Sequence, residues 1–211
     1  FLISKNNIII YIMNIMFSNK HKKITSFSQS NKNVVFSINS INTNNNSKIQ
    51  TNNNNNNSNE TNKMIWGKPT WYFLHTLAEK VKDDHFIQIK GELLGIIYQI
   101  CCNLPCPLCA NHAKKYLDNI NFSTINAKAD LIKMLYLFHN EVNSRKNYEL
   151  FNYNEVQNLY SKAKFINIAN NFFYHFNNYI NLKLQSDSLY RKQVTKKVKL
   201  WLNNNINHFN I

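Results

Sequence analysis

The chain has 211 residues and a formal charge of +14 at neutral pH, which is enough for one ordinary domain with tails or for two small domains. The charge belongs to the flanks, because residues 61–161 carry eleven basic and nine acidic side chains, a net of only +2. Only three glycines occur, Gly67, Gly91 and Gly95, which excludes a glycine-rich phosphate loop of the Rossmann or Walker type.

The first part of the chain is polar and repetitive. Residues 1–62 are rich in Asn, Lys and Ser and include an unbroken asparagine run from Asn52 to Asn57. Such a composition cannot bury enough apolar surface to offset chain entropy, so it predicts a disordered tail. The apolar run from Ile8 to Phe17 is about half of the roughly 20 residues that a membrane span needs, so no span is predicted.

At Met64 the composition changes, and a domain over residues 63–161 is predicted. Apolar side chains at helical spacing predict helices beginning near Pro69 and covering about 85–103, 107–118 and 127–146. Asn154 is the expected N-cap of a short fifth helix, which has Val156, Leu159 and Tyr160 on one side. Helices of this length with short connections predict an all-α fold, an antiparallel four-helix bundle with a short fifth helix.

Residues 162–211 are predicted to form a basic helical extension. They carry eight Lys or Arg and one acid, Asp187. Two apolar stripes at helical spacing run through it: Phe165, Ile168, Ala169, Phe172, Phe173, Phe176 and Ile180, then Tyr190, Val194, Val198, Trp201 and Leu202. The second stripe is expected to face away from Arg191, Lys192, Lys196, Lys197 and Lys199. These helices must therefore cover another surface or be covered.

All four cysteines lie within nine residues, so they cannot be a framework of disulfides spread over the fold. Cys106 and Cys109 flank Pro107 and Leu108 where the third helix is expected to begin, and this spacing puts both sulfurs on one face. The pair can close a small disulfide. Unpaired amides and the helix dipole are expected to lower the cysteine pKa there.

Other interpretations of the cysteines remain open at this stage. Cys102, Cys106, Cys109 and His112 could supply four ligands to a structural zinc ion, although zinc sites usually draw ligand pairs from two separated segments. A thioredoxin-type site is excluded because no βαβ pattern surrounds the pair. Cys101 and Cys102 are read as buried free thiols, with exchange between Cys102 and Cys106 as the alternative.

Three motifs in order carry a family resemblance. They are Trp66-Gly67-Lys68-Pro69-Thr70-Trp71 followed by His75, then Cys106-x-x-Cys109-x-x-His112, then His139-Asn140-x-Val142-Asn143. Together they resemble the Erv/ALR family of FAD-linked sulfhydryl oxidases, and most of all its viral branch in large cytoplasmic DNA viruses. The resemblance covers about residues 64–161.

The resemblance implies a homodimer that holds FAD inside the helical bundle. Cys109 is then expected to lie against the isoalloxazine ring, and Cys106 to meet the substrate. The remaining cofactor contacts implied are Gly67, Lys68, Thr70, Trp71 and His75 from the first helix, His139, Asn140 and Asn143 from the fourth, and Arg145 or Lys146 near the pyrophosphate. No metal site is expected.

The activity implied is FAD-dependent thiol oxidation, which makes disulfides in dithiol-containing proteins and passes the electrons to oxygen, giving hydrogen peroxide. The implied location is the host cytoplasm or virion for a viral protein, or the mitochondrial intermembrane space for a cellular one. The rival functions are a zinc-stabilised helical interaction module and a nucleic-acid-binding protein that uses residues 162–211. One departure from the family pattern is Lys146-Asn147-Tyr148, which stands in place of Leu-Gly-Lys; Asn147 can adopt the left-handed backbone that Gly would.

Overall fold

The computed structural model describes residues 64–178 and 185–211, so the predicted tail over 1–62 and Ile180 lie outside the described residues. The described residues form α-helices and two 3-10 turns, with one isolated β-bridge between Val81 and Phe209. The predicted all-α fold is confirmed. The helices are α2 (Gly67–Lys80), α3 (Asp83–Cys102), α4 (Pro107–Asp118), α5 (Lys128–Arg145), α6 (Tyr153–Ser161), α7 (Phe165–Asn178) and α8 (Gln185–Asn205), and the 3-10 turns are η1 (Phe122–Thr124) and η2 (Ile206–His208).

The helix ends have identifiable chemical causes. Pro107 opens α4, where its missing N–H costs nothing, and the Asp130 carboxylate accepts the backbone N–H groups of Asn126 and Ala127 at the start of α5, each at 2.9 Å. Helix α5 ends at Arg145, and Asn147, two residues further on, has a φ of 55°, which confirms the left-handed conformation expected there.

The N-cap prediction for the short fifth helix was wrong by two residues. Asn152 caps α6, because its side-chain oxygen accepts the backbone N–H of Asn154 at 3.0 Å. Leu159 was also placed on the wrong side: it is 41% exposed, whereas Val156 and Tyr160 are buried. Two asparagines at a two-residue spacing satisfy the same sequence signal, so pattern alone could not choose between them.

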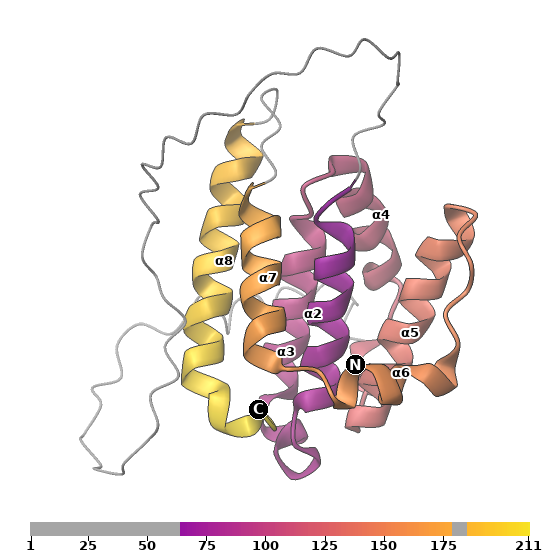
Figure 1. Ribbon diagram of the computed structural model, residues 1–211, viewed down its shortest axis with the longest axis vertical. Coiled ribbons are helices and arrows are strands. Elements are labelled where there is room, and N and C mark those ends of the chain that lie inside the picture. The colour runs from indigo at the N-terminus through magenta and orange to yellow at the C-terminus, as the bar shows by residue number, and fades with distance from the viewer. Residues whose placement is uncertain (1–63, 179–184) are drawn as a thin grey trace, which may run out of the picture.

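Helix α2 lies at the centre of the molecule. It packs against α7 on one side and against α5 and α6 on the other, while α3 packs against α4 and α8 (Figure 1). Residues 73–78 of α2 are all buried, together with Thr70. A helix buried on nearly all sides must find partners for its polar groups, and α2 carries one histidine and two threonines in this position.

The C-terminal extension covers the side of α2 and α3 that faces away from α5 and α6. Phe73 of α2 stacks on Phe172 of α7 with ring centroids 4.3 Å apart. On α8, the Trp201 indole N–H donates to the Glu92 carboxylate of α3 at 2.6 Å. The chain end is held as well, since the Asn210 N–H donates to the Lys80 carbonyl at 2.7 Å. No helix within the described ranges has the length and apolar character to cross a membrane.

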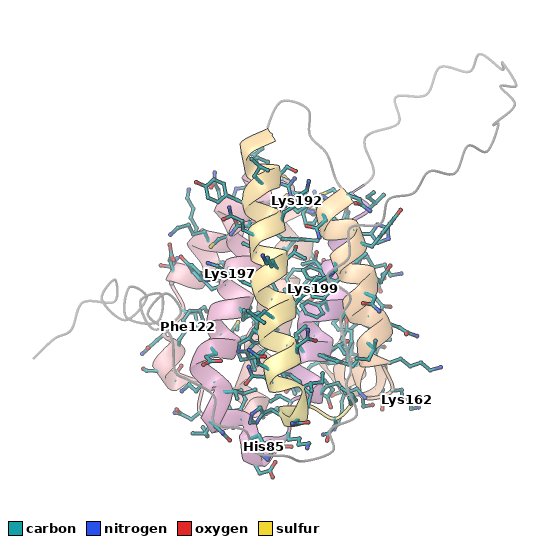
Figure 2. The ribbon with its side chains drawn as sticks, turned by 90° about the vertical axis from the view of Figure 1, so that its left-hand side faces the viewer. His85, Phe122, Lys162, Lys192, Lys197 and Lys199 are labelled. Carbon is teal, nitrogen blue, oxygen red and sulfur yellow. The ribbon has the colours of Figure 1, made fainter. Side chains whose placement is uncertain are left out.

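The predicted polar face of α8 was partly wrong. Arg191 is only 3% exposed and Lys199 is half-buried with its ammonium 5.0 Å from the Phe173 ring centre, whereas Tyr190 is 63% exposed. Arg191 lies three residues before the buried Val194 and therefore on the same face of α8. Long basic side chains can bury their aliphatic stems on such a face. Lys192 and Lys197 are exposed along α8, as Figure 2 shows.

We expect Phe172→Ala to lower the free energy of unfolding by about 3–5 kcal/mol, because it leaves a cavity against Phe73. Urea unfolding of the full chain measures this loss. Tyr174→Ala on the same helix is the matched control, since Tyr174 is 62% exposed and its removal should cost about 0.5 kcal/mol or less. Equal losses in the two variants would show that α7 does not pack on α2 as described.

Candidate active site

The cysteine pair lies at the N-terminus of α4. The Cys106 and Cys109 sulfurs are 2.6 Å apart, and both cysteines are free thiols. Cys106 is the N-cap of α4, since its sulfur accepts the backbone N–H of Cys109 at 3.2 Å. The predicted placement of both sulfurs on one face of a helix start therefore holds, and the pair can close a disulfide with little side-chain movement.

The electrostatics of Cys109 differ from the prediction. Burial raises the pKa of its thiol to about 11, with further contributions from the hydrogen bond to Cys106 and from the charge of Cys106; Lys146 and Arg145 act in the opposite direction. The expected lowering of the pKa by the helix dipole is therefore wrong for Cys109 in the dithiol form. Its sulfur is a protonated thiol at neutral pH, with two cations close enough to stabilise a thiolate.

The other two cysteines lie at the end of α3. Cys101 is 1% exposed, and burial raises its thiol pKa well above the ordinary range. Burial also raises the pKa of Cys102 to about 11. Among residues 64–178 and 185–211, no group of three or more His, Cys, Asp or Glu side chains is arranged to hold a metal ion. The zinc alternative, which needs Cys102 and His112 beside the pair, thus finds no support.

A large cleft lies between α2, α5 and α6 and the loop 146–152, with a volume of about 1030 Å³. Six of the residues predicted to contact a cofactor line it: Gly67, Lys68, Trp71, His139, Asn143 and Lys146. The rest of the wall was not predicted, and consists of Met64, Tyr72, Val142, Tyr148, Glu149, Leu150, Phe151, Asn152, Glu155, Leu159 and Tyr160. Val142 belongs to a motif, Tyr72 lies on α2 beside Trp71, and Met64 precedes α2. The others come from the loop 146–152 and from α6, whose positions the sequence does not specify.

A pair of histidines belongs to the cleft: His139 lines it, and His75 lies behind His139. His75 Nε2 lies 3.1 Å from His139 Nδ1, so one ring donates a hydrogen bond to the other. The Trp71 ring stacks on His139 at 4.1 Å, and Tyr160 stacks on His75 at 4.8 Å. Because His75 is only 2% exposed, it touches the cleft through its neighbours and does not line it.

Both imidazoles are neutral at physiological pH. Burial, with a smaller contribution from His139, lowers the pKa of His75 to about 3, and burial lowers the pKa of His139 to about 4. His139 therefore presents an uncharged aromatic ring to the cleft, and His75 adds no positive charge behind it. His75 Nδ1 has no hydrogen-bond partner among the described residues.

The two asparagines of the third motif hold the loop that borders the cleft. Asn140 donates to the Phe151 carbonyl at 2.9 Å and accepts the Phe151 N–H at 2.8 Å. Its amide is therefore used at both ends, and Asn140 does not line the cleft. Asn140 therefore positions the loop, and the direct cofactor contact predicted for it stays a prediction. Asn143 donates to the Glu149 carbonyl at 3.2 Å and also lines the cleft.

A smaller hollow of about 60 Å³ adjoins the cleft on the side of the cysteines. The predicted residues Thr70, Cys109 and Arg145 line this hollow. Gly67, Trp71, Val142 and Lys146 border both spaces. Cys109 thus lines a hollow that shares four residues with the cleft, while Cys106 lines neither space, and this arrangement distinguishes an inner from an outer sulfur.

The sequence of this chain is similar to those of known proteins. The model of the Erv1 / Alr family matches residues 68–162. The FAD-linked sulfhydryl oxidases of two isolates of African swine fever virus are each 33% identical over 98 residues, which cover 46% of this chain and 82% of the relative. A protein of Invertebrate iridescent virus 3 is 29% identical over 84 residues, 39% of this chain and 57% of that protein. No solved structure matches the chain significantly.

The matched region contains the cysteine pair and nearly all of the cleft wall, whereas α7 and α8 lie beyond it. The chain also spans most of the length of the African swine fever virus relatives, at more than 30% identity. On both grounds, this chain belongs to the Erv1/Alr family.

Proposed function

We propose that this chain is an FAD-dependent thiol oxidase that forms disulfides in dithiol-containing proteins and reduces oxygen to hydrogen peroxide. The observation that carries the proposal is the position of Cys109, which belongs to an adjacent cysteine pair and also lines a hollow that shares Gly67, Trp71, Val142 and Lys146 with a large aromatic cleft. The family membership and the printed names of the African swine fever virus relatives support the same activity.

The cleft has the size and the chemistry that a dinucleotide needs. Its volume of about 1030 Å³ lies at the upper end of the range for small-molecule sites. Lys68 and Lys146 supply positive charge for phosphates, and Trp71, His139 and Tyr160 supply aromatic faces. The inner hollow of about 60 Å³ is too small for a tricyclic ring, so ring entry requires the side chains around Cys109 to move apart.

The substrate step is a thiol–disulfide exchange at the outer sulfur. Starting from the Cys106–Cys109 disulfide, a substrate thiolate attacks Cys106; the bond to Cys109 breaks and Cys109 leaves as a thiolate. The second substrate thiol loses its proton and attacks the substrate sulfur of the mixed disulfide, which releases Cys106 and completes the substrate disulfide. Lys146 and Arg145 lie where they stabilise the departing Cys109 thiolate.

When bound, FAD would accept the electron pair from the inner cysteine and pass it, with two protons, to oxygen. The protein's part is to hold the half-buried Cys109 at the hollow and to place Lys146 and Arg145 near its sulfur. The neutral histidine pair fixes the cleft wall, because a hydrogen bond between His75 and His139 and the stack of Trp71 on His139 hold three side chains together.

A homodimer, specific substrate proteins and any role of residues 162–211 in binding nucleic acid stay predictions. Sedimentation of the purified chain would test the homodimer.

We expect Cys106→Ser and Cys109→Ser each to lower dithiol-dependent oxygen consumption by roughly 1,000-fold or more, because each removes one half of the disulfide. Both variants should still bind FAD. Cys102→Ser is the matched control, since Cys102 lines neither the cleft nor the hollow, and it should keep near-normal turnover. An oxygen electrode with a dithiol substrate measures the rates, and near-normal turnover in either serine variant of the pair would refute the mechanism.

Acid should destabilise the apoprotein through the histidine pair. Unfolded histidines have a pKa near 6.5, whereas the folded pKa values are about 3 for His75 and about 4 for His139. The unfolded state therefore binds more protons below pH 6.5, so stability present above that pH is lost as the pH falls toward 4.

Melting temperatures of the wild type and of a His75→Gln/His139→Asn double variant, taken between pH 7 and pH 4, measure this loss. We expect the wild type to lose roughly 5 °C more than the variant over that range. The pair His85 and His208, whose Nδ1 atoms are 3.1 Å apart, is present in both proteins and cancels in the comparison. Parallel pH profiles would mean that the cleft histidines are not buried as neutral groups.

A further inference from the structure

Trp66 places an unpaired hydrogen-bond donor inside the protein. The residue immediately precedes α2 and is only 4% exposed. Its indole Nε1–H is buried and has no hydrogen-bond partner in the part of the chain that the structure describes. Buried tryptophans usually find an acceptor for this group. Trp201 does so, since its Nε1–H donates to Glu92 at 2.6 Å, and the contrast sets Trp66 apart.

The indole of Trp66 belongs to the wall of the inner hollow, which Cys109, Thr70 and Arg145 also line. Its backbone is held in place, because the Thr70 hydroxyl donates to the Trp66 carbonyl at 2.7 Å and the Thr70 N–H donates to the same oxygen at 3.1 Å. The Thr70 hydroxyl proton is therefore already in a hydrogen bond within the protein. Trp66 is thus a neutral donor with a hydrogen-bonded backbone, in the lining of the same hollow as the inner sulfur.

We propose that the Trp66 indole N–H donates a hydrogen bond to the bound flavin ring, on the wall of the hollow that Cys109 lines. This inference rests on the proposed function, because it assumes that FAD is the ligand. Indole nitrogen is a donor only, so it pairs with an acceptor of the ring, a carbonyl oxygen or an unprotonated nitrogen. A buried donor without a partner in the apoprotein then becomes satisfied when the cofactor binds.

Trp66 was not among the residues that the motifs nominated as cofactor contacts, although it opens the first of them. Its part in the site follows from burial, an unpaired donor and a shared wall with Cys109. The donor also favours the more electron-rich state of an acceptor that it bonds, so it should help the ring to accept electrons.

Indole N–H resonances offer a direct test, because the full chain has only three tryptophans. Apoprotein prepared by removing the flavin is titrated with FAD while the three indole signals are followed by NMR, with Trp66→Phe and Trp201→Phe to assign two of them. We expect the Trp66 signal to move downfield on FAD binding, as a newly made hydrogen bond requires, while the Trp201 signal stays in place. A Trp66 signal that is unmoved at FAD saturation would overturn the inference.

FAD affinity of the same variants gives a second readout. Trp66→Phe should weaken FAD binding by roughly 2- to 10-fold, the size of one ordinary hydrogen bond, and Trp201→Phe should leave it unchanged. Conversely, Trp201→Phe removes a paired N–H and should lower the melting temperature of the apoprotein by more than Trp66→Phe does. Unchanged FAD affinity in Trp66→Phe would refute this inference alone, whereas a wild-type chain that binds no FAD would refute the proposed function as well.

Discussion

The packing of α2 between two layers is the constraint on which the rest of the molecule depends. On one side, Phe73 and its neighbours pack against α7; on the other, Trp71 lines the cleft, and His75 lies behind it, hydrogen-bonded to His139. One helix therefore serves both the apolar core and the cofactor site. Hydrogen bonds hold two of its buried polar side chains: the His75 Nε2 pairs with His139 on α5, and the Thr70 hydroxyl donates to the Trp66 carbonyl just before α2.

The site divides its tasks between two helices and a loop. Helix α4 presents the sulfurs, helix α5 supplies His139 and the cations that follow it, and the loop held by Asn140 closes the far side of the cleft. No single motif contains all of these tasks. The hollow at Cys109 and the larger cleft share the lining residues Gly67, Trp71, Val142 and Lys146, so these four residues lie between the inner sulfur and the proposed cofactor site.

The sequence predicted helices well because apolar periodicity and proline positions are local signals, and the helix beginning at Pro107 shows it. It predicted less well the pKa values, hydrogen-bond partners and burial of side chains, because these depend on residues distant in the chain. The raised pKa of Cys109 comes from burial beneath other segments, and Asn140 faces a loop eleven residues away. Burial of Arg191 beside an exposed Tyr190 likewise depends on how α8 is rotated against its neighbours, which a helical wheel gives only to within one residue.

The sulfur of Cys106 has both a structural and a chemical role. It accepts the Cys109 amide proton and so closes the first turn of α4, and it is also the atom proposed to be attacked by each incoming substrate. Its acceptor strength changes as it passes from thiol to disulfide to thiolate. Each change in the oxidation state of Cys106 therefore alters the hydrogen bond in the first turn of α4. The Cys109 amide should report the oxidation state of the cysteine pair independently of the flavin absorbance.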